Sequence, residues 1–205
     1  LSCGGFHEKQ TESKVANAHV IVDADGVVVE VYRKMHLFDV KIPGGAVLME
    51  SKTTEPGEAR AVVIESPVGR LGLTTCYDLR FPELYVALAR RGAQVILVPS
   101  AFTVPTGAAH WHLLLRARAV ETQCYVAAAA QVGRHNDKRA SYGHALGVDP
   151  WGTVLADAGP DASPELVYLD VDLDNLHRVR DKMPIAAHRR ADVLHLAAAA
   201  LDLPE

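Results

Sequence analysis

Cys76 is the leading candidate for a chemically active residue in this 205-residue chain. It follows the run 70–75, which we expect to be a buried strand, and it precedes Pro82 and Glu83, which are typical of a helix start. A thiol at such a corner projects from the sheet edge, and the helix N-terminus favours the nucleophilic thiolate. A buried structural cysteine is an equally good interpretation of the position alone.

Lys34 is the second candidate. It ends the β-branched run 27–32, so its long side chain could reach into a cleft at the edge of a neighbouring strand. A single lysine is usually a solvated surface charge, and the position alone favours that interpretation. Cys124 opens an apolar strand without polar neighbours, which indicates a structural cysteine.

The pattern around these residues predicts sheets covered by helices. Apolar runs at 18–22 and 27–32 flank turn residues and predict a hairpin. Residues 39–60, which include Pro43, Gly44 and Gly45, indicate a long irregular connection. Further strands are expected at 61–64, 70–76, 94–98, 125–130, 145–148, 153–156 and 166–169.

Helices are predicted from Pro82 to about Arg91, over Ala109–Thr122 and over Leu173–Lys182. The buried face of the second helix is expected to hold Leu113, Leu114, Ala117 and Val120. The core strands are continuously apolar, which is typical of an α/β or α+β layered fold. With neither repeat nor linker, residues 1–205 are interpreted as one domain.

Composition excludes several classes of function. The net charge of −4 and the dispersed basic residues argue against nucleic-acid binding, and the absence of a long apolar run argues against a membrane span. Three cysteines without C-x-x-C spacing favour a reducing compartment, the cytoplasm first, with mitochondria as an alternative. His110 and His112 point to different faces of their helix, so neither a metal nor a cofactor is expected.

Two segments together resemble the signatures of the nitrilase superfamily of carbon–nitrogen hydrolases: Tyr32-Arg33-Lys34-Met35-His36-Leu37-Phe38 and Cys76-Tyr77-Asp78-Leu79-Arg80-Phe81-Pro82-Glu83-Leu84. Similar segments recur in order along the chain, among them Pro99-Ser100-Ala101-Phe102, Arg139-Ala140-Ser141-Tyr142-Gly143-His144 and Asp149-Pro150-Trp151-Gly152. The segments 4–8 and 121–123 resemble the Nit1 branch.

The resemblance implies a cofactor-free amidase with an α-β-β-α sandwich fold that forms homodimers. Cys76 would attack an amide carbonyl and form a thioester. Lys34 and the N–H of Tyr77 would stabilise the oxyanion, and Glu50 would orient the lysine. A solvated loop carboxylate is the alternative interpretation of Glu50.

The substrate implied by the resemblance is a small anionic primary amide like deaminated glutathione. Arg80, His110 and Trp111 are expected to line its pocket. Each has an alternative: Arg80 could pair with Asp78 or Glu83, and Trp111 could belong to the core. An ω-amidase or an N-carbamoyl amidohydrolase of the same superfamily remains open, as does a non-catalytic binding or scaffold protein.

The catalytic glutamate of the family's Glu–Lys–Cys triad has no match. Glu8 and Glu12 lie in the wrong segment, and Glu30 lies within the strand that leads to Lys34. Because the first residue is Leu, we expect the chain to start inside the domain, without the N-terminal segment that carries this glutamate. General-base assistance of about 10²–10⁴-fold would then be lost.

Overall fold

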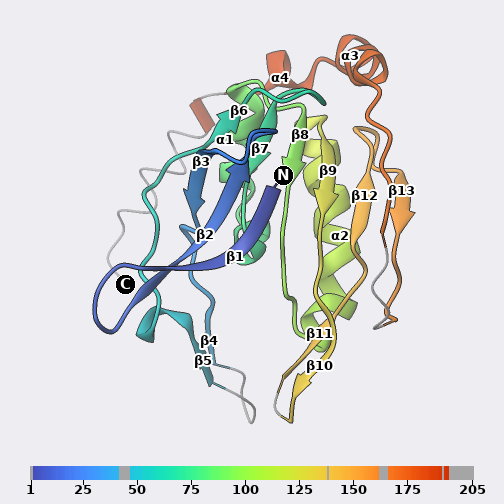
Figure 1. Cartoon of the computed structure of the whole chain (residues 1–205). Coiled ribbons are helices and arrows are strands. Elements are labelled where there is room, and N and C mark those ends of the chain that lie inside the picture. The colour runs from blue at the N-terminus through green and yellow to red at the C-terminus, as the bar shows by residue number, and fades with distance from the viewer. Residues whose placement is uncertain (1, 42–46, 138, 162–165, 191, 194–205) are drawn as a thin grey trace.

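Two β-sheets face each other, and helices cover the outer side of the larger one (Figure 1). A computed structural model describes residues 2–41, 47–137, 139–161, 166–190 and 192–193. The smaller sheet contains β1 (Ser2–Lys9), β2 (Val15–Val22) and β3 (Val28–Arg33), all antiparallel. The predicted hairpin is confirmed as β2–β3. Strand β1 has a β-bulge between Gly4 and Phe6, where Gly5 has a φ of +89°.

The larger sheet has the strand order β13-β12-β9-β8-β7-β6. Its strands are β6 (Val63–Ile64), β7 (Leu71–Leu73), β8 (Val95–Leu97), β9 (Tyr125–Ala128), β12 (Leu146–Val148) and β13 (Val154–Asp157). Strands β7, β8 and β9 are parallel, so their carboxyl ends meet at one edge. In open α/β sheets, ligands bind at that edge.

The helices follow the signals in the sequence with one shift. They are α1 (Pro82–Arg90), α2 (Val104–Thr122), α3 (Leu173–Lys182) and α4 (Ile185–His188), with 3₁₀ turns η1 (Glu50–Lys52) and η2 (Cys76–Arg80). Helix α1 begins at Pro82 as predicted, and α3 has the predicted bounds. Helix α2 begins at Val104 rather than at the predicted Ala109 and ends at Thr122 as predicted.

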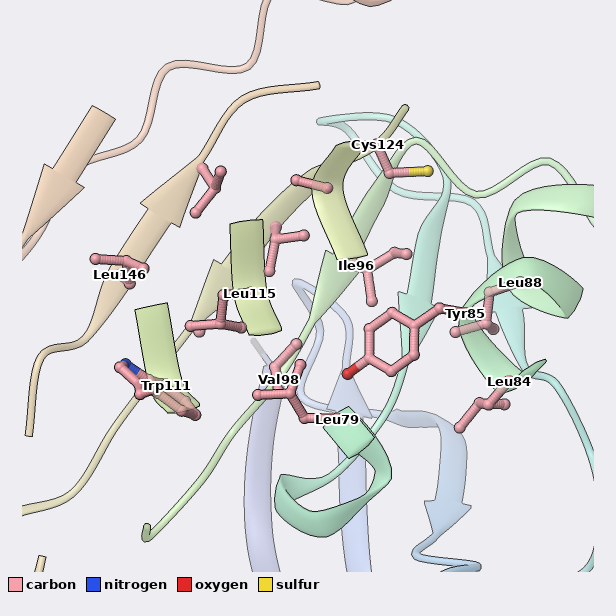
Figure 2. Close-up of a cluster of buried hydrophobic side chains, with 14 of the residues drawn as sticks. Leu79, Leu84, Tyr85, Leu88, Ile96, Val98, Trp111, Leu115, Cys124 and Leu146 are labelled. Atoms are coloured by element: carbon pink, nitrogen blue, oxygen red, sulfur yellow. The ribbon is translucent and has the colours of Figure 1, made fainter. Parts of the chain in front are cut away.

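Two apolar clusters hold the layers together. The first lies between α1, α2 and the larger sheet and includes Tyr85, Ile96, Trp111 and Leu115 (Figure 2). The second lies between the two sheets and includes Ile21, Tyr32, Leu73, Val95 and Tyr125. Neighbours along β8 point to opposite clusters, as the two-residue period of a strand requires.

The buried face of α2 is only partly the predicted one. Leu113 is 66% exposed and Val120 is also exposed, whereas Leu114 packs against the core and Leu115 is 0% exposed. The buried stripe contains Trp111, Leu115, Arg118, Ala119 and Thr122. Because this stripe includes the polar residues Arg118 and Thr122, its apolar spacing does not show the helical period in the sequence. The Arg118 guanidinium lies 5.4 Å from the centre of the Tyr85 ring and donates to the carbonyl of Leu79.

Three segments differ from the prediction. Residues 166–169 are not a strand, and part of 39–60 forms the hairpin β4 (Asp39–Lys41)–β5 (Val47–Met49) followed by η1. A second hairpin, β10 (Val132–Asn136)–β11 (Arg139–Tyr142), was not predicted. Residues 43–45 lie outside the described residues. Within the described part, no helix is long and apolar enough to cross a membrane.

A matched pair of substitutions on α2 tests the core. Leu115→Ala should lower the free energy of unfolding by about 2–5 kcal/mol, because it leaves a cavity between α2 and the larger sheet. Leu113→Ala should change it by no more than about 0.5 kcal/mol, because that side chain lies in solvent. Urea unfolding measures both. Equal losses, or a larger loss for Leu113→Ala, would contradict this assignment of the buried face.

Candidate active site

Cys76 lies at the edge where β7, β8 and β9 end. It begins η2 directly after the extended residue Thr75 and has a φ of +50°, which is unusual for a residue with a side chain. Its N–H donates to the carbonyl of Pro99, which follows β8, at 3.0 Å. This tight turn, rather than the longer strand 70–76 that we predicted, places the thiol at the sheet edge, partly exposed.

Lys34 reaches the same place from the smaller sheet. Its backbone N–H donates to the carbonyl of Asn17 on β2, and the residue is 2% exposed. The ammonium lies 2.5 Å from Oε2 of Glu50 at the start of η1. The same oxygen accepts the N–H of Phe38 at 2.7 Å, which fixes the carboxylate from a second side. Glu50 is therefore a partly buried partner of Lys34 and not a solvated loop residue.

A fully buried carboxylate, that of Asp78, connects the two segments. Its Oδ2 accepts the hydroxyl of Tyr32 at 2.7 Å and the N–H of Thr75 at 2.9 Å. Its Oδ1 lies 2.8 Å from Nδ1 of His36. Tyr32 and His36 flank Lys34 in the sequence, and Thr75 precedes Cys76. In the sequence, the only signal for this connection is that both segments resemble one family. Asp78 was considered there only as a partner of Arg80.

The charges around Cys76 oppose each other. Burial raises the pKa of the Cys76 thiol, and the positive charge of Lys34 opposes the rise. The negative charges of Glu50 and Asp78 add to it. Lys34 and a backbone hydrogen bond at Ala101 favour the thiolate, against burial and the neighbouring carboxylates.

One cavity joins most of the predicted site residues. Cys76, Lys34, Glu50, Tyr77 and Arg80 all line it. The backbone that follows β8 and β9 forms a further part of the lining, with small residues at 99–101 and 128–130. The Arg80 guanidinium lies 5.7 Å from the ring centre of Tyr77 and 5.5 Å from that of Phe102. Stacking on two rings holds the cation at the cavity wall.

Two predicted pocket residues do not line this cavity. Trp111 is fully buried in the core, and its ring N–H donates to the carbonyl of His144 at 2.7 Å (Figure 2). The prediction that it contacts substrate is wrong, because its place on the buried stripe of α2 directs it into the core. His110 is exposed and contacts the cavity only indirectly, with its Nδ1 3.3 Å from Nη1 of Arg80.

Glu50 is the single carboxylate among the described residues that line the cavity. The other glutamates considered from the sequence have partners elsewhere: Glu8 pairs with Arg33, Glu12 with Lys9 and Glu30 with Arg60. Cys124 is buried, with its thiol 3.2 Å from the carbonyl of Ala93, which agrees with a structural role. Within the described ranges, the one group able to share a metal ion is His112, His144 and Asp157, away from this lining.

Comparison with known proteins gives matches to one family. Residues 1–181 match the carbon–nitrogen hydrolase family. The human deaminated glutathione amidase is 51% identical over 197 residues, which are 94% of this chain and 60% of that protein. The chain thus spans about 60% of the length of this relative.

Solved structures agree with the sequence matches. The crystal structure of the C. elegans NitFhit protein superimposes with a TM-score of 0.88 at 48% identity, over 94% of this chain and 47% of that one. An amidase from Nesterenkonia sp. AN1, which carries the product of Michael addition of acrylamide at its active-site cysteine, gives 0.69 at 30% identity, over 89% and 66%. The described residues therefore have the mixed α/β fold of these proteins.

The electrostatic coupling of Lys34 to Cys76 can be measured without any substrate. Lys34→Met should move the pH profile of iodoacetamide alkylation at Cys76 to higher pH, because the thiol loses the charge that lowers its pKa. Each unit of pKa lowers the alkylation rate below the midpoint about tenfold. A Cys3→Ser background removes the exposed thiol. Lys52→Met, at the end of η1, is the control, and an unchanged profile in Lys34→Met would contradict the coupling.

Proposed function

The chain belongs to the carbon–nitrogen hydrolase family, and we propose that it supplies the nucleophile and the oxyanion site of an amidase acting on a small anionic primary amide. The observation that carries the proposal is the arrangement of Cys76 and Lys34. They come from different sheets, line one cavity and are coupled electrostatically. The relatives called deaminated glutathione amidase support a substrate of that kind.

The proposed reaction starts with attack of the Cys76 sulfur on the amide carbonyl carbon. The carbonyl oxygen becomes an oxyanion, which accepts hydrogen bonds from the Lys34 ammonium and the N–H of Tyr77. Tyr77 lies in the first turn of η2, where backbone donors have no intrahelical acceptor. Collapse of this intermediate breaks the C–N bond. The leaving nitrogen takes the proton that the Cys76 thiol gave up and departs as ammonia. Water then cleaves the thioester, which releases the carboxylate product and restores the thiol.

Glu50 is proposed to position Lys34 rather than to transfer protons. Its Oε2 is already engaged by the lysine and by the N–H of Phe38, which holds the carboxylate against the ammonium. The proton of the Cys76 thiol needs another acceptor, because burial raises the pKa of that thiol. Glu50 is the only carboxylate in the described cavity lining, so the described residues supply no second carboxylate for this role.

Arg80 is proposed to bind a carboxylate of the substrate. It lines the same cavity as Cys76, and its two aromatic neighbours hold the guanidinium at the wall, where it can donate to a carboxylate beside its contact with His110. The described ion pairs include neither Asp78 nor Glu83 as its partner, and Asp78 is bound to Tyr32 and His36 instead. A cation in this position favours an amide whose other end is negative.

We propose one domain, a homodimer and the cytoplasm as its setting. Val120 on the outer face of α2 is exposed, and so is Trp151. Trp151 precedes Gly152, whose carbonyl accepts a hydrogen bond from Arg116 of α2. Apolar residues gathered on one face are typical of subunit contacts. The three free cysteines among the described residues fit a reducing compartment.

Substitution of the nucleophile tests the reaction. Cys76→Ala should abolish ammonia release from deaminated glutathione, because losing the nucleophile of a covalent acyl-transfer enzyme costs on the order of 10⁶ in kcat. Cys124→Ser is the matched control and should change kcat only slightly, since that sulfur lies in the core. The assay uses the protein expressed from its whole coding sequence. Substantial turnover by Cys76→Ala would sink the mechanism.

The choice of substrate is tested at Arg80. Arg80→Leu should lower kcat/KM for deaminated glutathione about 10- to 100-fold, since a hydrogen bond to a charged group contributes about 1.5–3 kcal/mol. A neutral primary amide should be hydrolysed at an unchanged rate, and Arg90→Leu on α1 is the control. Faster turnover of α-ketoglutaramate or of an N-carbamoyl acid than of deaminated glutathione would assign the chain to another activity of the family.

A further inference from the structure

A second cluster of reactive side chains lies away from the cavity, between α2 and β13. Nε2 of His112 is 2.9 Å from Oδ2 of Asp157, and Nδ1 of His144 is 2.8 Å from Oδ1 of the same carboxylate. The two ring nitrogens and a carboxylate oxygen all lie within 4.8 Å of one another. His112 and His144 are 45 and 13 positions from Asp157, so three separate segments meet here.

We propose that His112, His144 and Asp157 bind a divalent transition-metal ion of the zinc class. Two imidazoles and one carboxylate form a donor set that suits zinc, nickel or copper better than magnesium or calcium. Two ligand atoms bound to one zinc ion at the tetrahedral angle lie about 3.3 Å apart, from bonds of about 2.0–2.1 Å. The distances of 2.8–2.9 Å to the carboxylate need to open slightly, and the ring nitrogens, which lie within 4.8 Å of each other, need to come to about this separation to accept the ion.

The surroundings hold these groups in place before any ion binds. His144 has a φ of +58°, and its backbone carbonyl accepts the ring N–H of Trp111 from the core. Its ring stacks on Tyr142 with centroids 4.6 Å apart. Asp157 Oδ1 accepts the N–H of Gly159 at 2.8 Å, and the N–H of His144 donates to the carbonyl of Gly159. Fixed ligands of this kind are what an outer shell provides in metal sites.

Access and proton chemistry also fit an ion. The side chains of all three residues are partly exposed, so an ion and its remaining water ligands can reach them from solvent. Each histidine already directs one ring nitrogen at Asp157, and an ion bound at that nitrogen leaves the other ring nitrogen to carry the N–H. The ion would then replace two hydrogen bonds by coordinate bonds and join α2 to the edge strand β13.

Zinc titration by calorimetry tests this site independently of amidase activity. The chain carries Cys3→Ser and Cys76→Ala, so that accessible thiols do not compete for the ion. We expect one zinc ion per chain, an increase in Tm on binding, and an affinity at least about tenfold lower in His112→Ala and in Asp157→Asn. His177→Ala, an exposed histidine on α3, is the matched control and should bind as the parent does.

Three results would overturn the proposal. They are an absence of saturable zinc binding to the parent, an affinity that is the same in His112→Ala and Asp157→Asn as in the parent, and an equal loss in His177→Ala. Magnesium serves as a probe of ion class, and binding as tight as that of zinc would also reject the assignment. In those cases the three side chains form a hydrogen-bonded surface cluster only.

Discussion

The buried carboxylate of Asp78 joins the strand that carries Lys34 to the turn that carries Cys76. A carboxylate removed from water is costly unless hydrogen bonds compensate its charge, and Asp78 has partners on both segments: Tyr32 and His36 on one side, and the backbone N–H of Thr75 on the other. Separating the two segments would leave this charge buried without partners. The position of the lysine relative to the sulfur is therefore part of what keeps the two sheets together.

The same arrangement explains why the cysteine needs its neighbours. Burial disfavours the thiolate, and Asp78, which holds the turn in place, adds a negative charge nearby. Lys34 opposes both effects, and the ion pair with Glu50 holds its buried ammonium in place. Each group thus compensates a cost created by another, so the site works as a unit of four side chains. The role of each residue depends on the others, which is why position alone left Cys76 undecided and favoured a solvated charge for Lys34.

Elements whose ends carry start and stop residues were predicted from local signals in the sequence. Pro82 and Gly92 delimit α1, and the turn 23–26 marks the hairpin β2–β3. Features set by distant contacts were not predictable in this way. The buried face of α2 depends on Arg118 packing over Tyr85, and residues 166–169 are apolar without being a strand. Trp111 resembled a pocket residue until its place on the buried stripe was known.

The candidate site divides in the same manner. The paired segments around Lys34 and Cys76 identified both residues, because each segment has a recognisable sequence. The contact between Glu50 and Lys34 and the Asp78 network depend on how the two sheets pack, which no local pattern encodes. The three parallel strands supply a wall of small residues and backbone at their carboxyl ends, Lys34 follows the last strand of the smaller sheet, and Glu50 lies in η1. The candidate site therefore lies at the junction of the sheets, and a change in their packing would alter it even if every side chain were kept.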